Sequence, residues 1–234
     1  MFSLRLLARV LPSSCALCGQ LCAGVVCDGC RGDAVIIRSR CHRCANPLPA
    51  ADAAAGRACG ACVAAPPAFE TTIAGADYQA PLDQLVLQLK FGGVLPLAAW
   101  FAALLRDQVL RQARADLPDV LVPVPLGRRR LVERGFNQAL EVARPLSRML
   151  GVPVEAQLAA RIVETAPQSA LPPLQRGTNV CAAFAATAGV RGLHVGVVDD
   201  VMTSGRTLDA VAHALKQAGA LRVSNYVVAR TPPK

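Results

Sequence analysis

Two adjacent acids, Asp199 and Asp200, follow the apolar residues 195–198. An apolar strand that ends in acids places their carboxylates in the crevice where open α/β folds bind ligands, at the carboxyl end of a parallel sheet. Two neighbouring hydroxyl groups of a sugar are suitable partners for such a pair. An Asp-Asp turn without a ligand is the alternative, so the residues that follow decide the interpretation.

The loop after the acids predicts an anion site. It precedes residues 208–218, which have the apolar spacing of a helix. The first N–H groups of a helix have no partner within the helix, and with the helix dipole they attract an anion. A phosphate is therefore expected at Thr203, Ser204, Gly205, Arg206 and Thr207. A Ser/Thr helix cap is the alternative, and a dinucleotide site is disfavoured because no Gly-x-Gly-x-x-Gly motif follows a predicted strand.

A second predicted strand, residues 120–124, opens into an arginine-rich loop. The strand tip and loop are Val124, Pro125, Leu126 and Gly127, followed by Arg128, Arg129, Arg130 and Arg134. Guanidinium groups match phosphate oxygens in shape and charge, so a pyrophosphate is the expected ligand. A solvated basic loop and a patch for nucleic-acid phosphates are the alternatives.

Eight of the ten cysteines form four Cys-x-x-Cys pairs near the amino terminus. They are Cys15 and Cys18, Cys27 and Cys30, Cys41 and Cys44, and Cys59 and Cys62. Two such pairs close a tetrahedral zinc site that has no open position, so the four pairs suggest two structural sites, and one or two zinc ions per chain are expected. Pairing the first two and the last two closes the shortest loops and is favoured. We expect this segment to unfold on chelation and the rest of the chain to stay folded.

Other uses of the cysteines are disfavoured. A disulfide framework would need an oxidising compartment, and a thioredoxin-like redox pair needs a single motif near a βαβ unit. Cys22 and Cys181 are left over, and Cys181 is interpreted as a small buried hydrophobe. His42, inside one pair, is expected to be solvated.

The composition indicates a folded, basic chain. The 234 residues are 53% hydrophobic with a net charge of +9, which excludes wholesale disorder and favours phosphate-bearing partners. No apolar run reaches the roughly 20 residues that span a bilayer, and residues 1–10 do not resemble a secretion signal, so we expect a cytoplasmic protein.

The elements that position these groups alternate between strands and helices. Residues 64–69 predict a linker, which divides the chain into a cysteine-rich domain, residues 1–68, and a second domain, residues 69–234. Strands are predicted at residues 71–78, 120–124, 152–158, 195–200 and 223–228, and helices at 81–90, 95–112, 136–150 and 208–218. This alternation predicts the α/β class, a parallel sheet with helices on both faces.

The motif Asp-Asp-x-x-x-Thr-Ser-Gly-x-Thr resembles the site for phosphoribosyl pyrophosphate (PRPP) in type I phosphoribosyltransferases. Its order with the cysteine pairs and four shorter motifs resembles the ComF family over nearly the whole chain. These motifs are Leu89-Lys90-Phe91, Arg134-Gly-Phe-Asn137-Gln, Arg161 with Thr165 and Gln168, and Arg176 with Asn179.

The resemblance implies roles for these residues. Asp199 and Asp200 would bind the ribose hydroxyls, residues 203–207 the 5′-phosphate, and residues 124–128 with Arg134 and Asn137 the pyrophosphate. Arg161, Gln168, Arg176 and Asn179 would lie in a hood over the site. Mg²⁺ would accompany PRPP, and the family is linked to DNA uptake during natural transformation, with single-stranded DNA and the uptake machinery as partners.

Three functions stay open at this point. The first is a PRPP-binding protein that acts in DNA uptake or processing. The second is a phosphoribosyltransferase of nucleotide salvage, for which no acceptor-binding motif can be identified. The third is a zinc-ribbon nucleic-acid adaptor with a vestigial ligand site, which the intact Asp-Asp motif disfavours.

Overall fold

The structure is a computed structural model that describes residues 13–112, 116–163 and 183–232. The amino-terminal elements are β1 (Ser13–Ser14), β2 (Leu21–Cys22), α2 (Asp28–Ala34), α3 (Ala50–Ala54) and α4 (Gly60–Ala64). The elements that follow are β3 (Thr71–Asp77), α5 (Leu82–Gly92), α6 (Pro96–Arg111), β4 (Val120–Pro123), α7 (Arg128–Arg134), α8 (Gln138–Leu150), η1 (Ala156–Leu158), β5 (Ala159–Arg161), β6 (Phe184–Ala186), η4 (Ala188–Val190), β7 (His194–Met202), α10 (Arg206–Gln217) and β8 (Arg222–Arg230).

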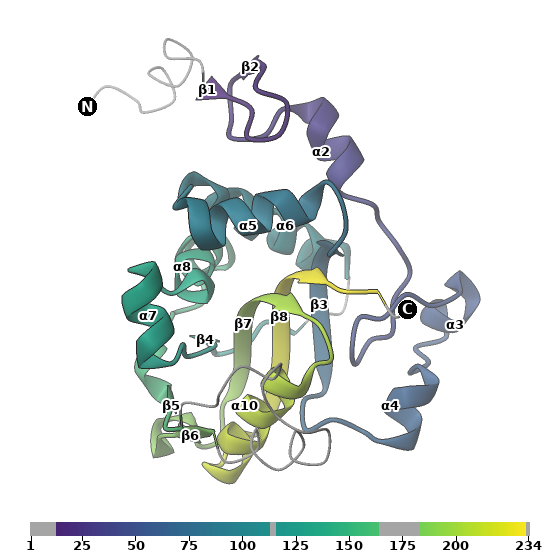
Figure 1. The fold of residues 1–234 in the computed structure, drawn as a ribbon. Helices are drawn as coiled ribbons and strands as arrows, with labels where there is room; N and C mark the ends of the chain where they lie inside the picture. Colours follow the sequence, from purple (N-terminus) through teal and green to yellow (C-terminus); the bar gives the residue numbers. More distant parts are fainter. Residues whose placement is uncertain (1–12, 113–115, 164–182, 233–234) are drawn as a thin grey trace, which may run out of the picture.

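A four-stranded parallel sheet forms the centre of the molecule, in the order β3-β8-β7-β4 (Figure 1). All four strands therefore end at the same edge of the sheet, and the tips of β4 and β7 are neighbours there. This arrangement confirms the predicted fold class, and it brings together the two strand tips that the sequence marks as phosphate sites.

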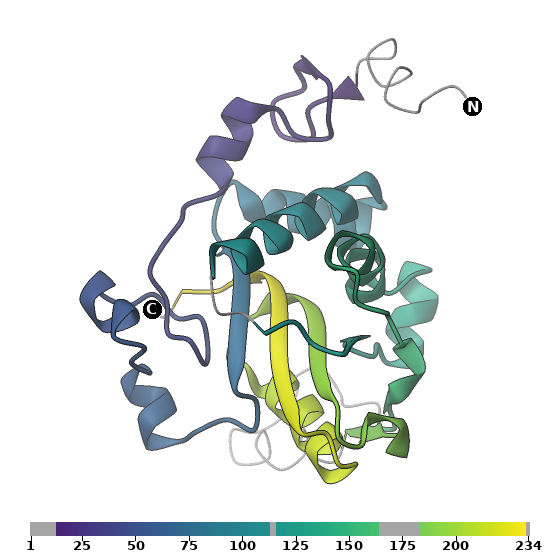
Figure 2. The ribbon, with the colours of Figure 1, turned by 180° about the vertical axis from the view of Figure 1, so that it is seen from behind.

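Helices cover both faces of the sheet. On one face α10 packs Leu208, Val211 and Leu215 against alternate valines of β7 and β8. On the other face α5, α6 and α8 pack against the intervening positions, among them Val198 and Tyr226 (Figures 1 and 2). Because successive strand residues point to opposite faces, both faces of these strands must be apolar. The apolar strands seen in the sequence follow from this.

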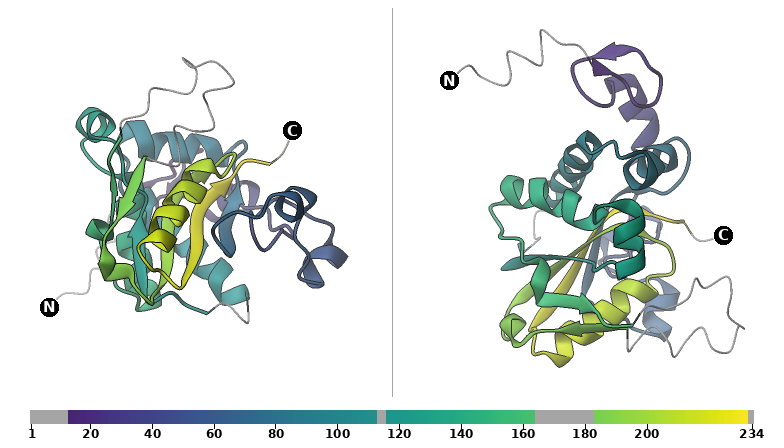
Figure 3. Two further views of the ribbon diagram at one scale, coloured as in Figure 1. Left: turned by 90° about the horizontal axis from the view of Figure 1, so that it is seen from below. Right: turned by 60° about the vertical axis from the view of Figure 1, so that its left-hand side comes forward.

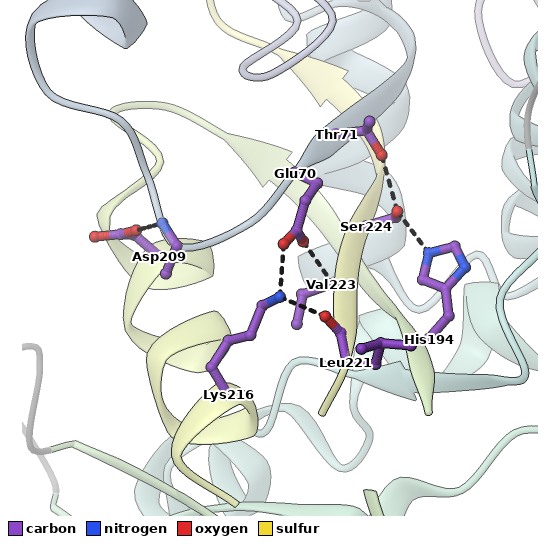
Figure 4. A network of polar contacts seen from close by, with 9 residues as sticks. Glu70, Thr71, His194, Asp209, Lys216, Leu221, Val223 and Ser224 are labelled. Atoms are coloured by element: carbon purple, nitrogen blue, oxygen red, sulfur yellow. Dashed lines mark hydrogen bonds and ion pairs between the residues drawn. The ribbon is translucent and has the colours of Figure 1, made fainter. Parts of the chain in front are cut away.

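A polar network holds the amino ends of β3, β7 and β8 (Figure 4). Glu70 pairs with Lys216 of α10 at 2.5 Å and also accepts the N–H of Val223. Ser224 accepts the Thr71 hydroxyl at 2.8 Å and contacts the His194 ring at 2.7 Å. Burial lowers the pKa of His194, so its imidazole is neutral at pH 7. These contacts fix the end of the sheet opposite to the predicted ligand site.

Two sequence-based predictions of secondary structure are wrong. Residues 152–158 do not form a strand: Val154 makes one parallel bridge with Leu121, and η1 follows. Pro153 has no N–H to donate, which interrupts a ladder at this edge of the sheet. The arginine-rich segment is not a loop, because residues 128–134 form the helix α7, which ends at Gly135 with a left-handed φ of 76°.

The first cysteine-rich module, with Cys15 to Cys30, and the second, with Cys41 to Cys62, contact different parts of the larger domain (Figures 1 and 3). The first lies beyond α5 and α6, where Gln88 donates to the Ala16 carbonyl at 2.8 Å and Arg31 pairs with Asp107 at 3.0 Å. The second lies beside β3, where the Thr72 N–H donates to the His42 carbonyl at 2.9 Å. In the described part of the chain, no helix is long and apolar enough to cross a membrane.

Candidate functional site

The two acids lie in the second half of β7, near the carboxyl edge of the sheet. Asp199 accepts the N–H of Asp200 at 2.9 Å, and Asp200 accepts the N–H of Val201 at 2.6 Å. These local bonds hold both carboxylates close to the backbone. The Nζ atom of Lys90, from the last turn of α5, lies 3.1 Å from Asp200 Oδ2. A cation from a distant part of the chain thus faces the acid pair.

Ionisation of Asp199 is unfavourable in the absence of a ligand. Burial and the neighbouring charge of Asp200 raise the pKa of Asp199 to about 8, although Lys90 lowers it. A carboxyl group with so high a pKa at a strand tip is typical of a functional site. Hydroxyl donors or additional cations would stabilise its ionised form.

The loop after β7 has the geometry of an anion site. Residues 203–205 form a bend, and Gly205 caps α10 with a left-handed φ of 82°. This left-handed φ favours glycine, because a residue with a side chain would be strained there. The loop encloses a hollow of about 30 Å³ that is lined by Asp199 and by residues 201–208.

The helix after this loop begins at Arg206, two residues earlier than the sequence indicated. Arg206 and Thr207 therefore belong to the first turn of α10, and their N–H groups are among those without a partner inside the helix. The predicted phosphate-binding residues, Thr203 to Thr207, thus surround one helix amino terminus, with Asp199 on the same hollow.

A backbone hydrogen bond joins the predicted pyrophosphate segment to the acid pair. The Val124 N–H donates to the Val198 carbonyl at 2.9 Å, one residue before Asp199. Asn137 reinforces this position: its Nδ2 donates to the Val124 carbonyl at 3.1 Å, and its Oδ1 caps α8 by accepting from Ala139. Asn137 thus has a structural contact at the place where the resemblance implies a ligand contact.

The four arginines of the basic segment lie on or beside α7. Arg128, Arg129 and Arg130 are exposed, and Arg129 pairs with Glu133 at 2.8 Å. The Arg134 guanidinium lies 5.1 Å from the centre of the Phe91 ring, a cation–π contact. Lys90 and Phe91 together connect the end of α5 to both halves of the predicted site.

A larger cavity of about 400 Å³ lies behind the pyrophosphate segment, between the tip of β4, α7 and α8. Pro125, Leu126 and Asn137 belong to both the cavity and the predicted ligand site. Its remaining walls are mainly apolar, with Glu141 and Arg144 paired at 2.7 Å at its border. A flat or aliphatic group fits such walls better than a phosphate does.

The eight paired cysteines form two tetrads, and the favoured pairing is confirmed. One tetrad is Cys15, Cys18, Cys27 and Cys30, and the other is Cys41, Cys44, Cys59 and Cys62; within each, the sulfur atoms lie within 4.8 Å of one another. The Cys18 and Cys27 sulfurs are 3.8 Å apart, and those of Cys44 and Cys59 are 3.5 Å apart. Sulfurs at about 2.3 Å from a tetrahedral zinc ion are separated by roughly 3.8 Å.

The thiols of each tetrad shift one another's pKa values, and a shared cation would remove this competition between them. Burial opposes the ionisation of Cys59, but N–H and thiol donors around it lower its pKa to about 7. Burial raises the pKa of Cys44 to about 11, with the Cys59 thiolate contributing. Four thiolates can coexist at this distance only around a cation, so the donor set fits structural zinc.

Sequence reasoning did not assign a contact to three residues that the structure places around the site. Lys90 and Phe91 belong to one of the sequence motifs, so the sequence marked these two residues. It did not indicate their partners, Asp200 and Arg134, which lie more than 40 residues away. Arg230, in the last strand, carried no signal at all. Its guanidinium reaches the carbonyls of Met202 and Thr203 in the phosphate loop.

The expected hood residues are only partly described. Arg161 lies in β5, and its guanidinium is 5.3 Å from the centre of the Phe184 ring. The antiparallel pair of β5 and β6 packs against α10. Its position over the site stays a prediction. Thr165, Gln168, Arg176, Asn179 and Cys181 lie outside the described residues.

Comparisons with known proteins agree with this architecture. A phosphoribosyl transferase domain matches residues 137–234, and a double zinc ribbon domain matches residues 6–63. The chain is 37% identical over 228 residues to DNA utilization protein YhgH of Salmonella typhimurium, which covers 94% of this chain and 98% of that protein. It is 30% identical over 179 residues to competence protein F of Haemophilus influenzae, which covers 74% of this chain and 78% of that protein.

A solved structure of glutamine PRPP amidotransferase from B. subtilis, complexed with ADP and GMP, aligns with 61% of this chain and 30% of that chain. The sequences are 19% identical, and the TM-score is 0.41.

Proposed function

The chain belongs to the ComF family, whose members join a double zinc ribbon to a phosphoribosyltransferase domain, and from this premise we propose that it binds PRPP and acts in DNA uptake or processing. Asp199 and Asp200 are assigned to the ribose hydroxyls and residues 203–207 to the 5′-phosphate. Residues 124–128 and Arg134 are assigned to the pyrophosphate. The proposed division between the two domains is at residue 68.

One observation carries the PRPP part of the proposal. The Val124–Val198 hydrogen bond joins the tip of β4 to the strand that carries the acid pair, and Asp199 lines the hollow formed by residues 201–208. The phosphate loop, the acid pair and the pyrophosphate segment are therefore neighbours in this order. The same order is found in PRPP, whose ribose carries a phosphate at one end and a pyrophosphate at the other. Isothermal titration of the full-length protein with PRPP and Mg²⁺ tests this directly, and an absence of binding at millimolar PRPP contradicts it.

Magnesium is proposed to arrive with PRPP. The pyrophosphate group carries several negative charges, and a hard divalent cation bound by phosphate oxygens would neutralise part of them. The residues described here would then hold the sugar and the phosphates. Whether PRPP is transferred to an acceptor is a separate question, which base-dependent release of pyrophosphate measures. A salvage enzyme would show that release, whereas a PRPP-binding protein would not.

The names of the relatives support the DNA part of the proposal. DNA utilization protein YhgH and competence protein F each match most of this chain. The exposed arginines of α7 offer a basic surface beside the ligand site, and basic surfaces attract nucleic-acid phosphates. Uptake and processing of DNA inside the cell is consistent with a proposed cytoplasmic location.

Two arginine variants separate the PRPP role from the DNA role. Arg128→Ala, at the pyrophosphate segment, should weaken PRPP binding by about tenfold because it removes a charged donor. The double change Arg129→Ala and Arg130→Ala should instead weaken binding to single-stranded DNA and flatten its salt dependence by about one to two units. Calorimetry measures the first effect and filter binding at several salt concentrations the second. The basic segment is only a solvated surface if neither ligand responds.

Lys90 should control the pH dependence of PRPP binding. Ionised Asp199 binds the ribose, so affinity should rise as the pH passes through about 8, the pKa of Asp199 without ligand. Lys90→Met removes the cation that lowers this pKa, so the rise should move to higher pH and the affinity at pH 7 should fall about tenfold. Lys90→Arg should restore most of it.

Lys216→Met is the matched control for this variant. Lys216 pairs with Glu70 at the amino ends of the strands, away from the ligand site. Calorimetry from pH 6 to pH 9 on the four proteins gives the result. An unchanged pH profile for Lys90→Met, with PRPP binding intact, contradicts a role for Lys90 at the acid pair.

A further inference from the structure

Arg230 connects the second zinc tetrad to the phosphate loop. Its side chain is buried, with a relative exposed area of 6%. On one side its Nε atom donates to the carbonyl of Cys44, a ligand of the second tetrad, at 2.8 Å. On the other side its Nη1 atom donates to the carbonyls of Met202, at 3.1 Å, and of Thr203. One rigid guanidinium therefore spans both sites.

The geometry of the tetrad makes this contact depend on zinc. Arg230 donates to the backbone carbonyl of Cys44, and the side chain of the same residue is one of the four sulfur ligands. An ion bound by Cys41 and Cys44 would fix the turn between them and therefore the direction of this carbonyl. Without the ion the turn is held less firmly, so the Arg230 side chain, and the Thr203 carbonyl to which it donates, lose one of their two fixed points.

Further contacts join the same two parts of the molecule. Arg38 and Arg40, which precede Cys41, pair with the buried Asp77 at the end of β3 at 2.7 and 2.8 Å. The N–H of Ala68, which follows the second tetrad, donates to Asp209 in the first turn of α10 at 2.8 Å. The second tetrad is thus attached at the start of the helix that the phosphate loop caps.

The first tetrad has no comparable connection among the described residues. In the first tetrad Cys18 is exposed, Cys27 and Cys30 are half-buried, and the buried Cys15 lies in the apolar cluster of α5 and α6. Cys41, Cys44 and Cys62 are instead buried in the same apolar cluster as Leu208 of α10. The contacts described for the first module reach α5 and α6, not α10. The two zinc sites therefore differ in what they can influence.

We propose that Arg230 is a positioning residue through which the second zinc site, and not the first, holds the phosphate loop in its binding conformation. This inference rests on the proposed function for its ligand, PRPP, but the coupling itself concerns residues 203–207 and can be measured without a ligand. The zinc ion acts here only through the protein groups that surround it.

Arg230→Lys tests the connection. Lysine has a single nitrogen on a flexible stem and cannot serve the Cys44 carbonyl and the loop carbonyls together, whereas it keeps the charge. Amide hydrogen exchange of residues 203–207 in the ligand-free protein should become about tenfold faster, and PRPP affinity should fall about tenfold. Two zinc ions per chain should remain. Arg222→Lys is the control, because Arg222 begins the same strand and pairs with the exposed Asp116.

A matched pair of cysteine variants tests the role of zinc. Cys59→Ser and Cys30→Ser each remove one half-buried ligand, from the second and the first tetrad respectively. Exchange at residues 203–207 should accelerate in Cys59→Ser and stay at the wild-type rate in Cys30→Ser. The peptides of β4 and α8 serve as internal references: lower overall stability accelerates exchange in all peptides, so exchange at residues 203–207 in Cys59→Ser should accelerate by a larger factor than exchange in β4 and α8.

Two results overturn the inference. One is wild-type exchange at residues 203–207 in Arg230→Lys, and the other is equal acceleration in the two cysteine variants. If the wild-type protein does not bind PRPP at all, the proposed function fails, but the exchange rates still decide whether the second zinc site and the loop are coupled.

Discussion

The double variant Asp199→Asn and Asp200→Asn should bind PRPP about 10²- to 10⁴-fold more weakly than the wild-type protein. Each substitution keeps the size of the side chain and removes its charge. A hydrogen bond to a charged group contributes about 1.5–3 kcal/mol, so the loss of two such bonds to the ribose gives this range. Calorimetry with PRPP and Mg²⁺ measures the change.

The substitution at position 199 should not destabilise the fold. Burial and the charge of Asp200 raise the pKa of Asp199 to about 8, so its carboxyl group is mostly protonated at pH 7 without a ligand. Asparagine is also neutral and has the same size, so Asp199→Asn alone should leave the melting temperature at pH 7 level, whereas Asp200→Asn also removes the ion-pair partner of Lys90. Asp52→Asn with Asp83→Asn, on α3 and α5, is a control with the same net charge. Equal PRPP affinity in both double variants would show that the acids at the tip of β7 do not bind the ribose.

Loss of the second zinc ion should destabilise the whole molecule. Cys44 and Cys62 are buried in a cluster that continues into β7, β8 and α10. From the sequence we expected the larger domain to stay folded on chelation, but this shared packing predicts that it loses stability too. Binding of structural zinc contributes about 10–16 kcal/mol in zinc-finger peptides. Even a fraction of this is several kcal/mol, and each kcal/mol of lost stability lowers the melting temperature of a chain of this size by about 2–4 °C. Cys44→Ser with Cys62→Ser should therefore lower the melting temperature by about 10 °C or more.

Cys18→Ser with Cys30→Ser, in the more exposed first tetrad, should leave the main thermal transition within about 4 °C of the wild-type value. Circular dichroism on the two double variants gives the comparison, and zinc analysis should find one ion per chain in each. Equal shifts in the two variants would show that the second tetrad is no more integrated in the core than the first.

The sequence by itself determined the parts of this protein whose chemistry is local. The spacing of each Cys-x-x-Cys pair brings two sulfurs to one ion, and the Asp-Asp motif with its hydroxyl loop joins a strand tip to a helix amino terminus within ten residues. Because such geometry depends on neighbouring dihedral angles, residue types and spacing were sufficient to predict it. Alternating strands and helices likewise predicted the parallel sheet.

Only the tertiary structure decided how these local units meet. Three contacts have no sequence signal for their pairing: the Val124–Val198 bond, the ion pair of Lys90 with Asp200, and the bond from Arg230 to Cys44. Although some of these residues stand in motifs, the two partners of each contact are 74 to 186 residues apart. The tertiary structure also decided the secondary structure of residues 128–134, which form α7, and of residues 152–158. In the second segment a proline at the edge of the sheet competes with the local propensity for a strand. Such contacts depend on the packing of whole layers, which spacing along the chain does not encode.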